Sequence, residues 1–258
     1  MALTLTGYIE NPMGKKNAVF SNRDMYRDLY TKKFDMVLLR ENGNINYKLY
    51  TKGSNYYIHL KIPSEVVPRF AYDVVIEFYT DDEATSASRS LMNYSVRFYS
   101  NDPSFVFTYC KAFVDNDLFI KQLEPKMSRK AITDIAAERN PKEIVGYVKS
   151  LYFAYLWIKN KSLLNKTVFD SYATKLVWSD FLKLIEHADD KIAARQQAGA
   201  LIDKEKRKQK EEEKQRKLLN KKDIEHAVSV AGTVSKTKTV NKVSSSKTVK
   251  KAKTIKKI

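Results

Sequence analysis

The chain has 258 residues and a formal net charge of +17. Aromatic residues make up 12% of it, but it contains only seven glycines and one cysteine, which argues against a glycine-rich nucleotide-binding fold and excludes an internal disulfide. No segment approaches the roughly 18 consecutive apolar residues of a membrane span, and the N-terminus lacks a signal-peptide pattern. We therefore expect a soluble intracellular or intraparticle protein, with no membrane partner.

The first 125 residues are predicted to form a β-rich domain. Phe34 to Leu39 is an apolar run, and the Asn42-Gly43 pair that follows is a strong hairpin signal because both residues tolerate positive φ. The returning strand alternates apolar and polar residues from Ile45 to Leu49. A turn at Lys52 to Ser54 then leads to a third strand, which Pro63 ends.

Further strands are predicted at Tyr72 to Tyr79 and at Tyr94 to Phe98, with an exposed loop at residues 81–90 between them. The run from Phe105 to Tyr109 is either a strand buried on both faces or the start of a short helix. Cys110 follows this apolar run, so we expect a buried, inert thiol. Five or more short strands predict an α+β protein with an N-terminal antiparallel β-sandwich-like domain, or a strongly bent sheet.

Residues 126–200 are predicted to form a helical subdomain. Ser128 can cap a short helix that runs to about Arg139. Asn140-Pro141 then offers a cap and a first-turn proline for a second, heavily buried helix that extends to Ile158. A third helix opens at Ser179-Asp180 and continues into the next segment.

Residues 201–231 are predicted to form a projecting, solvated helix. From Lys204 to Lys217 there is no apolar residue, yet the Lys, Arg, Glu and Gln side chains of this segment are good helix formers and opposite charges recur at close spacing. Leu218, Leu219 and Ile224 add a small apolar patch further along the helix. A helix that is polar on every side is stabilised by such charge pairs or by a partner. A homo-oligomer is one partner that the sequence allows.

The last segment, residues 232–258, contains nine lysines and no acidic or aromatic side chain. It cannot bury an apolar core, so we expect a disordered polycation. Lysine contacts phosphate as a point charge, which predicts sequence-independent and salt-sensitive binding to nucleic acid. The candidate nucleic-acid-binding residues are Lys236, Lys238, Lys242, Lys247, Lys250, Lys251, Lys253, Lys256 and Lys257.

The sequence carries no recognisable catalytic motif, and we expect a non-enzymatic protein without a metal or cofactor. The three histidines, His59, His187 and His226, do not stand at metal-ligand spacing from one another. Asp73 and Glu77 share a strand face and would be the acids of a metal-dependent nuclease. A solvated strand edge explains these two acids more simply.

Aromatic residues of the predicted sheet offer an alternative nucleic-acid interface, because exposed rings stack on unpaired bases. Most of these rings are expected to pack in the core instead. The residues concerned are Tyr47, Tyr50, Tyr56, Tyr57, Phe98 and Tyr99.

Two segments, Asn93 to Phe107 and Asn140 to Tyr152, resemble segments of uncharacterised virion-associated proteins of tailed bacteriophages. The resemblance covers about residues 90–160 and implies a particle component of the head or the head–tail junction. It thus implies a location in the virion or the host cytoplasm. The leading hypothesis is thus a structural or assembly protein of a phage particle, with other virion proteins and nucleic acid as partners. The alternative is a free DNA- or RNA-binding protein that acts in phage replication or expression.

Overall fold

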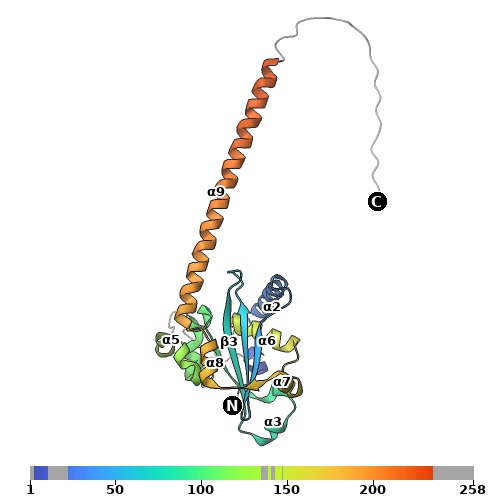
Figure 1. The fold of residues 1–258 in the computed structure, drawn as a ribbon, viewed down its shortest axis with the longest axis vertical. Coiled ribbons are helices and arrows are strands. Elements are labelled where there is room, and N and C mark those ends of the chain that lie inside the picture. Colours follow the sequence, from blue (N-terminus) through green and yellow to red (C-terminus); the bar gives the residue numbers. More distant parts are fainter. Residues whose placement is uncertain (1–2, 11–22, 135–138, 141–142, 147, 235–258) are drawn as a thin grey trace, which may run out of the picture. The chain divides into compact units, whose positions relative to one another are not determined.

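The computed structural model describes residues 3–10, 23–134, 139–140, 143–146 and 148–234 (Figure 1). The chain divides into two compact units, Met1–Ile202 and Asp203–Ile258. Within the described residues, no helix is both long enough and apolar enough to cross a membrane.

A five-stranded sheet in the order β4-β3-β2-β1-β5 forms the centre of the first unit. Its strands are β1 (Tyr47–Lys52), β2 (Asn55–Pro63), β3 (Ala71–Tyr79), β4 (Ser95–Ser100) and β5 (Thr174–Lys175). The first four strands pair antiparallel in a meander, and β5 pairs parallel with β1. Gly53 closes the β1–β2 turn at a φ of 60°, so the predicted turn at Lys52 to Ser54 and the predicted end of β2 at Pro63 are confirmed.

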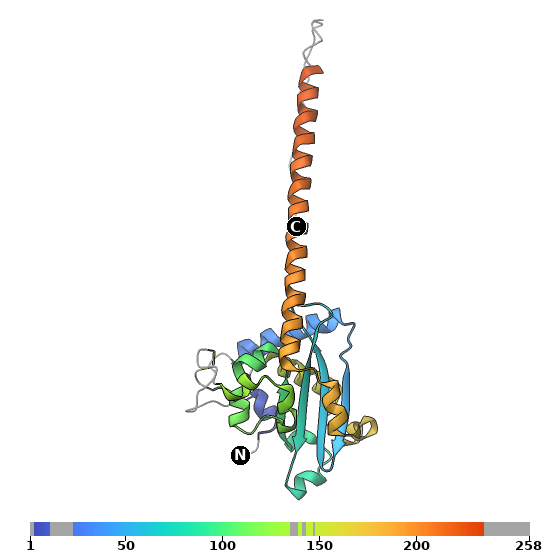
Figure 2. The ribbon, with the colours of Figure 1, turned by 60° about the vertical axis from the view of Figure 1, so that its left-hand side comes forward.

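Helices cover both faces of this sheet (Figures 1 and 2). On one face, Trp157 of α6 (Lys149–Asn160) packs against Tyr47, with ring centroids 6.2 Å apart. On the opposite face, Phe181 of α8 (Trp178–Leu184) packs 5.1 Å from Tyr50. The α+β class is therefore confirmed, but the sheet is a single open layer between helices and not a β-sandwich. The sandwich prediction failed because the layers that cover the sheet have helical periodicity.

The clearest correction concerns the predicted first strand and hairpin, which lie in helix α2 (Arg23–Arg40) and its C-terminal cap. Phe34 and Val37 are each 1% exposed, whereas Met36 and Leu39 are 71% and 82% exposed. Burial thus recurs at helical spacing. The sequence hides this spacing, because five of the six residues from Phe34 to Leu39 are apolar. Asn42 and Gly43 do adopt positive φ, of 53° and 72°, but they end the helix, and the Gly43 N–H donates to the Leu38 carbonyl at 2.7 Å.

The helices predicted between residues 128 and 158 are shorter than expected. Helix α5 spans only Arg129–Thr133, and residues 135–138 of the prediction lie outside the described residues. Asn140 caps no helix: its side chain accepts from the Ile144 N–H at 2.8 Å and donates to the Ile144 carbonyl at 3.0 Å. Both polar groups of the Asn140 side chain are thus used by Ile144 and cannot cap a helix. Helix α6 begins only at Lys149, nine residues after Asn140.

The remaining elements are short, apart from the last helix. The run from Phe105 to Tyr109 is a π-helical turn that leads into helix α4, so the helical alternative was the correct one. A short helix, α3, interrupts the predicted loop at residues 81–90, with the Asp82 carboxylate accepting from the Thr85 N–H at 2.6 Å. The bounds are α1 (Leu5–Glu10), α3 (Glu83–Ala87), α4 (Cys110–Asp115), α7 (Lys166–Tyr172) and α9 (Ala188–Val234).

The core of the first unit is rich in aromatic rings. Tyr8, Phe98, Phe105 and Phe113 form one ring cluster with centroid separations of 4.6 to 5.9 Å. Cys110, which is 1% exposed, lies in the same core, and its burial raises the pKa of the thiol to about 12. The predicted buried thiol is confirmed.

Candidate functional site

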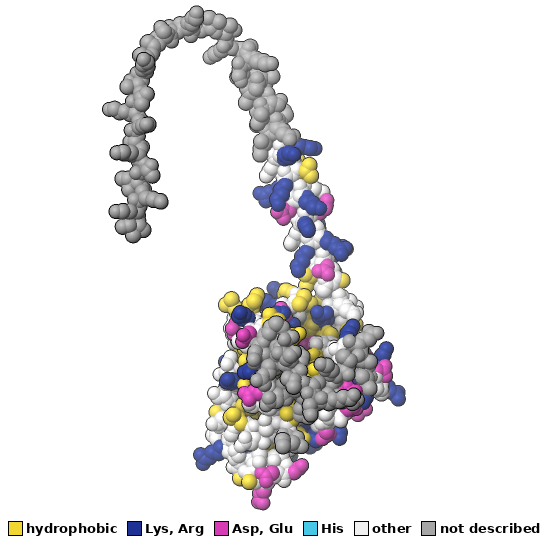
Figure 3. All heavy atoms as spheres, turned by 180° about the vertical axis from the view of Figure 1, so that it is seen from behind, with side chains coloured by type: hydrophobic (Ala, Val, Ile, Leu, Met, Phe, Trp, Pro, Cys, Tyr) yellow, Lys and Arg dark blue, Asp and Glu magenta, His cyan; other side chains and the backbone are white. Residues whose placement is uncertain are grey.

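The nine tail lysines predicted to bind nucleic acid lie outside the described residues. The part of α9 that precedes them is described, and we call residues 203–222 the charged segment. Every residue of this segment is exposed, and it carries ten basic and five acidic side chains, a net charge of +5. Lys and Arg side chains predominate on its visible face (Figure 3).

Local charge pairing explains why the charged segment is helical although it lacks an apolar face. Lys208 pairs with Glu212 at 3.8 Å, and Glu213 pairs with Lys217 at 2.6 Å, both at i,i+4 spacing. Each such pair stabilises a helix by about 0.2–0.5 kcal/mol. Leu218 and Leu219 are exposed within the segment, as expected for the predicted patch, whereas the side chain of Ile224 lies outside the described residues.

The aromatic residues of the sheet do not present open ring faces. Tyr57, Phe98 and Tyr99 are at most 2% exposed, and Tyr50 is also buried. Tyr47 and Tyr56 are partly buried and pack against the core. These six rings therefore stabilise the fold, as was expected for most of them, and the sheet offers no stacking platform among the described residues.

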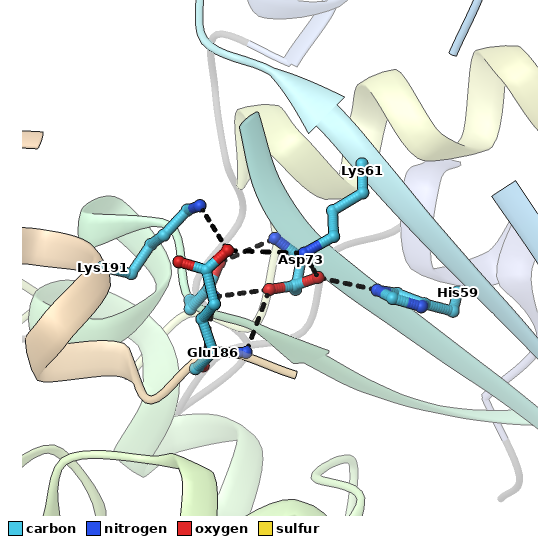
Figure 4. Close-up of polar contacts among 6 residues, drawn as sticks. His59, Lys61, Asp73, Glu186 and Lys191 are labelled. Carbon is cyan, nitrogen blue, oxygen red and sulfur yellow. Dashed lines mark hydrogen bonds and ion pairs between the residues drawn. The ribbon is translucent and has the colours of Figure 1, made fainter. Parts of the chain in front are cut away.

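A buried network of charged groups is centred on Asp73 of β3 (Figure 4). The Asp73 carboxylate is 0% exposed, and its Oδ1 lies 2.7 Å from His59 Nε2 and 2.7 Å from Lys61 Nζ. Its Oδ2 accepts from Asn101 Nδ2 at 2.9 Å and from the Glu186 N–H at 3.4 Å. Strand alternation places these groups together, since Asp73 pairs with Lys61 in the β2–β3 register.

The network continues beyond the sheet to the start of α9. Glu186 Oε1 lies 3.5 Å from Lys61 Nζ and 2.9 Å from Lys191 Nζ, and Lys191 also lies over the Phe70 ring at 4.5 Å. Burial by itself would raise the pKa of Asp73, but the hydrogen bonds and charges of His59 and Lys61 outweigh it and hold this pKa below its ordinary value. Asp73 is therefore a stably ionised group at the centre of the network.

The same network explains why the helix predicted to run on from Ser179 is interrupted. Helix α8 ends at Leu184 and α9 begins at Ala188. In the gap, the Glu186 N–H donates to Asp73 and the Glu186 carbonyl accepts from Asn101 Nδ2 at 3.3 Å. Tertiary partners on the sheet thus satisfy backbone groups that a continuous helix would have used itself.

Glu77 occupies a second, separate polar cluster on β3. It accepts from the Tyr57 hydroxyl at 2.7 Å and from Asn55 Nδ2 at 3.0 Å, and it lies 3.6 Å from Arg97. Asp73 and Glu77 are 0% and 2% exposed, so the expectation of a solvated strand edge was wrong. Both acids lie beneath covering elements on the α8 face of the sheet, which strand alternation alone could not indicate.

The histidines and acids do not form a metal site in the part of the chain that the structure describes, where no three His, Cys, Asp or Glu side chains converge. His59 is 5% exposed and is held by Asp73. His187 Nδ1 accepts from the Asp189 N–H at 3.3 Å, beside the start of α9. His226 lies within α9, and its side chain is outside the described residues. Asp73 already meets four protein donors, and its network joins the β-sheet to the start of α9.

A cavity of about 410 Å³ lies at the same end of the sheet as Asp73. It opens between α2, the first turn of α6 and Arg195 of α9, and we call it the Arg195 cavity. The alternation of side chains separates it from the Asp73 network, because Tyr72 and Asp102 line the cavity whereas their neighbours Asp73 and Asn101 belong to the network. Sequence reasoning missed this cavity, because its residues come from six separate segments.

Comparisons of the chain with protein-family models, with curated proteins and with solved structures find no match. A functional proposal for this chain therefore rests on its own residues and geometry, together with the resemblance noted in the sequence.

Proposed function

We propose that this chain is a non-enzymatic structural or assembly component of a phage particle, in the head or head–tail region, that contacts nucleic acid non-specifically. The observation that carries the nucleic-acid part is the charged segment, where 20 consecutive residues are exposed and net charge is +5. Nine further lysines follow it in the tail. Such a polycation binds phosphates by releasing counterions and does not read base edges.

The particle part of the proposal is supported by the resemblance to virion-associated proteins. It is also compatible with the first unit, whose central acids are occupied by protein donors and serve to hold elements together. In this proposal the first unit contacts other virion proteins, whereas the charged segment and the tail lie against nucleic acid. The buried sheet aromatics do not favour the alternative of a free binder that uses the sheet face.

The nucleic-acid part is tested by measuring the affinity of the full chain for duplex DNA and for single-stranded RNA at several salt concentrations. Each phosphate neutralised contributes about −0.9 to the log–log slope on duplex DNA, so contacts from all nine tail lysines predict a slope of up to about −8. Replacing these nine lysines by glutamine should remove most of this slope, and replacing them by arginine should retain it. Binding that is independent of salt would contradict the proposal.

A second variant separates the charged segment from the tail. Lys204→Gln, Lys206→Gln and Lys210→Gln together should make the slope shallower by about 3 if the segment contacts phosphates. The particle part requires the chain at a fixed copy number in purified particles. If the chain is absent from purified particles, the particle part is rejected, whereas the nucleic-acid part is not affected.

A further inference from the structure

The Arg195 cavity carries more positive than negative side chains. Lys33 and Lys149 line it, and both pair with Glu65, at 2.9 and 2.7 Å. The third cation is Arg195, and no carboxylate of the described residues lies within 4.0 Å of its guanidinium. One glutamate therefore serves two lysines, whereas Arg195 hydrogen-bonds with the Tyr72 hydroxyl and has no carboxylate partner among the described residues.

The other acid in the cavity is Asp102, which is buried and accepts a hydrogen bond from the backbone. Asp102 is 6% exposed, and its Oδ1 accepts from the Ser104 N–H at 2.8 Å. Burial raises the pKa of Asp102 above its ordinary value, although hydrogen bonds from Ser104 and Ser150 and the charges of Lys149 and Arg195 oppose this shift. Three cations, Lys33, Lys149 and Arg195, thus face two acids, Glu65 and Asp102, and the positive side chains of the cavity are in excess.

Two groups of hydrogen-bond donors at the cavity, one on Arg195 and one at the start of α6, are not satisfied by a side chain of the described residues. The Nε–H of Arg195 is buried and meets no acceptor in the described part of the chain, and a buried donor of this kind requires an explanation. Helix α6 has 12 residues, and its N-cap position, Val148, supplies no side-chain hydrogen bond to the first turn. Lys149 and Ser150 of that first turn line the cavity. Helix N-termini and arginine side chains both favour phosphate.

The remaining walls of the cavity are suited to an organic group. Leu29, Ile62 and Phe153 contribute apolar surface, and Tyr72 contributes its ring, while its hydroxyl hydrogen-bonds with Ser64 and Arg195. A volume of about 410 Å³ falls within the range of roughly 300–1,000 Å³ that is typical of small-molecule pockets. We therefore consider a small organic phosphate, and not a nucleic-acid backbone, as the ligand of this cavity.

We propose that the Arg195 cavity binds a small phosphomonoester, with its phosphate between Arg195, Lys33 and Lys149 and its organic part against Leu29 and Phe153. A phosphate group matches three cations that outnumber the acids of the cavity, and the apolar wall gives the organic part a place away from water. The lining of the cavity shares no residue with the charged segment, so this inference does not depend on the proposed contact with nucleic acid.

The test is calorimetric titration of the full chain with three probes: adenosine 5′-monophosphate, inorganic phosphate and adenosine. The monophosphate is expected to bind at least tenfold more tightly than inorganic phosphate, and adenosine should bind at least tenfold more weakly than the monophosphate. Glu65→Gln, which releases Lys33 and Lys149, should strengthen binding of the monophosphate several-fold.

Variants of Arg195 decide whether the cavity is the site of binding. Arg195→Ala should weaken binding of the monophosphate at least tenfold, and Arg195→Lys should retain part of the affinity. Lys121→Ala is the control and should leave the affinity unchanged, because the Lys121 side chain is 76% exposed and pairs with Asp117 away from the cavity. If Arg195→Ala does not fold, Glu65→Gln and Arg195→Lys still decide the question.

The proposal is overturned if the monophosphate does not bind at millimolar concentration, or if the variants of Arg195 and Glu65 bind it as the unchanged chain does. Equal affinities for inorganic phosphate and the monophosphate would also overturn it, because the apolar wall would then contribute nothing.

Discussion

Removing the Asp73 carboxylate should be among the most destabilising single changes on the sheet. The Asp73→Ala substitution leaves Asn101 Nδ2 and the Glu186 N–H short of an acceptor, and it takes from His59 its anionic partner. Each buried donor left unpaired costs about 1–3 kcal/mol. Lys61 adds less because it is 31% exposed and also lies near Glu186. We therefore expect a loss of about 3–5 kcal/mol in the free energy of unfolding.

Urea denaturation of the full chain, followed by tryptophan fluorescence, measures this loss. Trp178 lies 5.6 Å from Phe181, which in turn lies 5.6 Å from His59, so the probe reports on the region concerned. Asp180→Ala is the control, because Asp180 forms an exposed pair with Lys183 at 2.9 Å. Its removal should cost less than about 1 kcal/mol.

The same carboxylate predicts a change in acid stability. The pKa of Asp73 is lower in the folded chain than its ordinary value of 3.8. The ionised Asp73 carboxylate therefore contributes its full stabilisation at a pH above its pKa in the unfolded chain. This contribution is lost as the pH falls through its lower pKa in the folded chain. Asp73→Asn should flatten this part of the stability profile below about pH 4. A loss of less than about 1 kcal/mol in Asp73→Ala, together with an unchanged acid profile in Asp73→Asn, would refute the assignment of the network as a stabilising element.

Two further predictions concern the backbone and the thiol. Gly43→Ala should cost about 1 kcal/mol, because Gly43 has a φ of +72° and any side chain there is strained. Gly199→Ala, in α9 with open space around the added Cβ, should instead stabilise the chain by up to about 1 kcal/mol; equal effects in urea denaturation would contradict this reasoning. Cys110 should resist iodoacetamide at pH 8 in the native chain and react in denaturant, because its pKa is about 12 and it is 1% exposed. Rapid labelling of the native chain would argue against its burial.

The local pattern of the sequence was sufficient for several elements. Alternating side chains located β2, β3 and β4, and Gly53 and Pro63 marked where β1 and β2 end. The charged composition of residues 201–231 was enough to predict a helix there, because i,i+4 pairing is a local interaction. Burial of Cys110 followed from the apolar run before it.

Tertiary structure decided two features that local sequence left ambiguous: the end of α2 and the break between α8 and α9. Asn42 and Gly43 supply positive φ to a hairpin or to a helix end, and the packing of Phe34 and Val37 selected the helix. The break at Glu186 exists because Asp73 and Asn101 bind its backbone, and these two residues are more than 80 positions away in the chain.

What the sequence by itself determined about this protein is therefore its local periodicity, its turns and its basic C-terminal part, all of which depend on residues within a few positions of one another. The tertiary structure alone decided that Asp73 and Glu77 are buried and paired, and that Lys33, Lys149 and Arg195 surround one cavity. The physical reason is that burial and charge pairing depend on which elements pack together, and that packing minimises the free energy of the whole chain and not of any one segment.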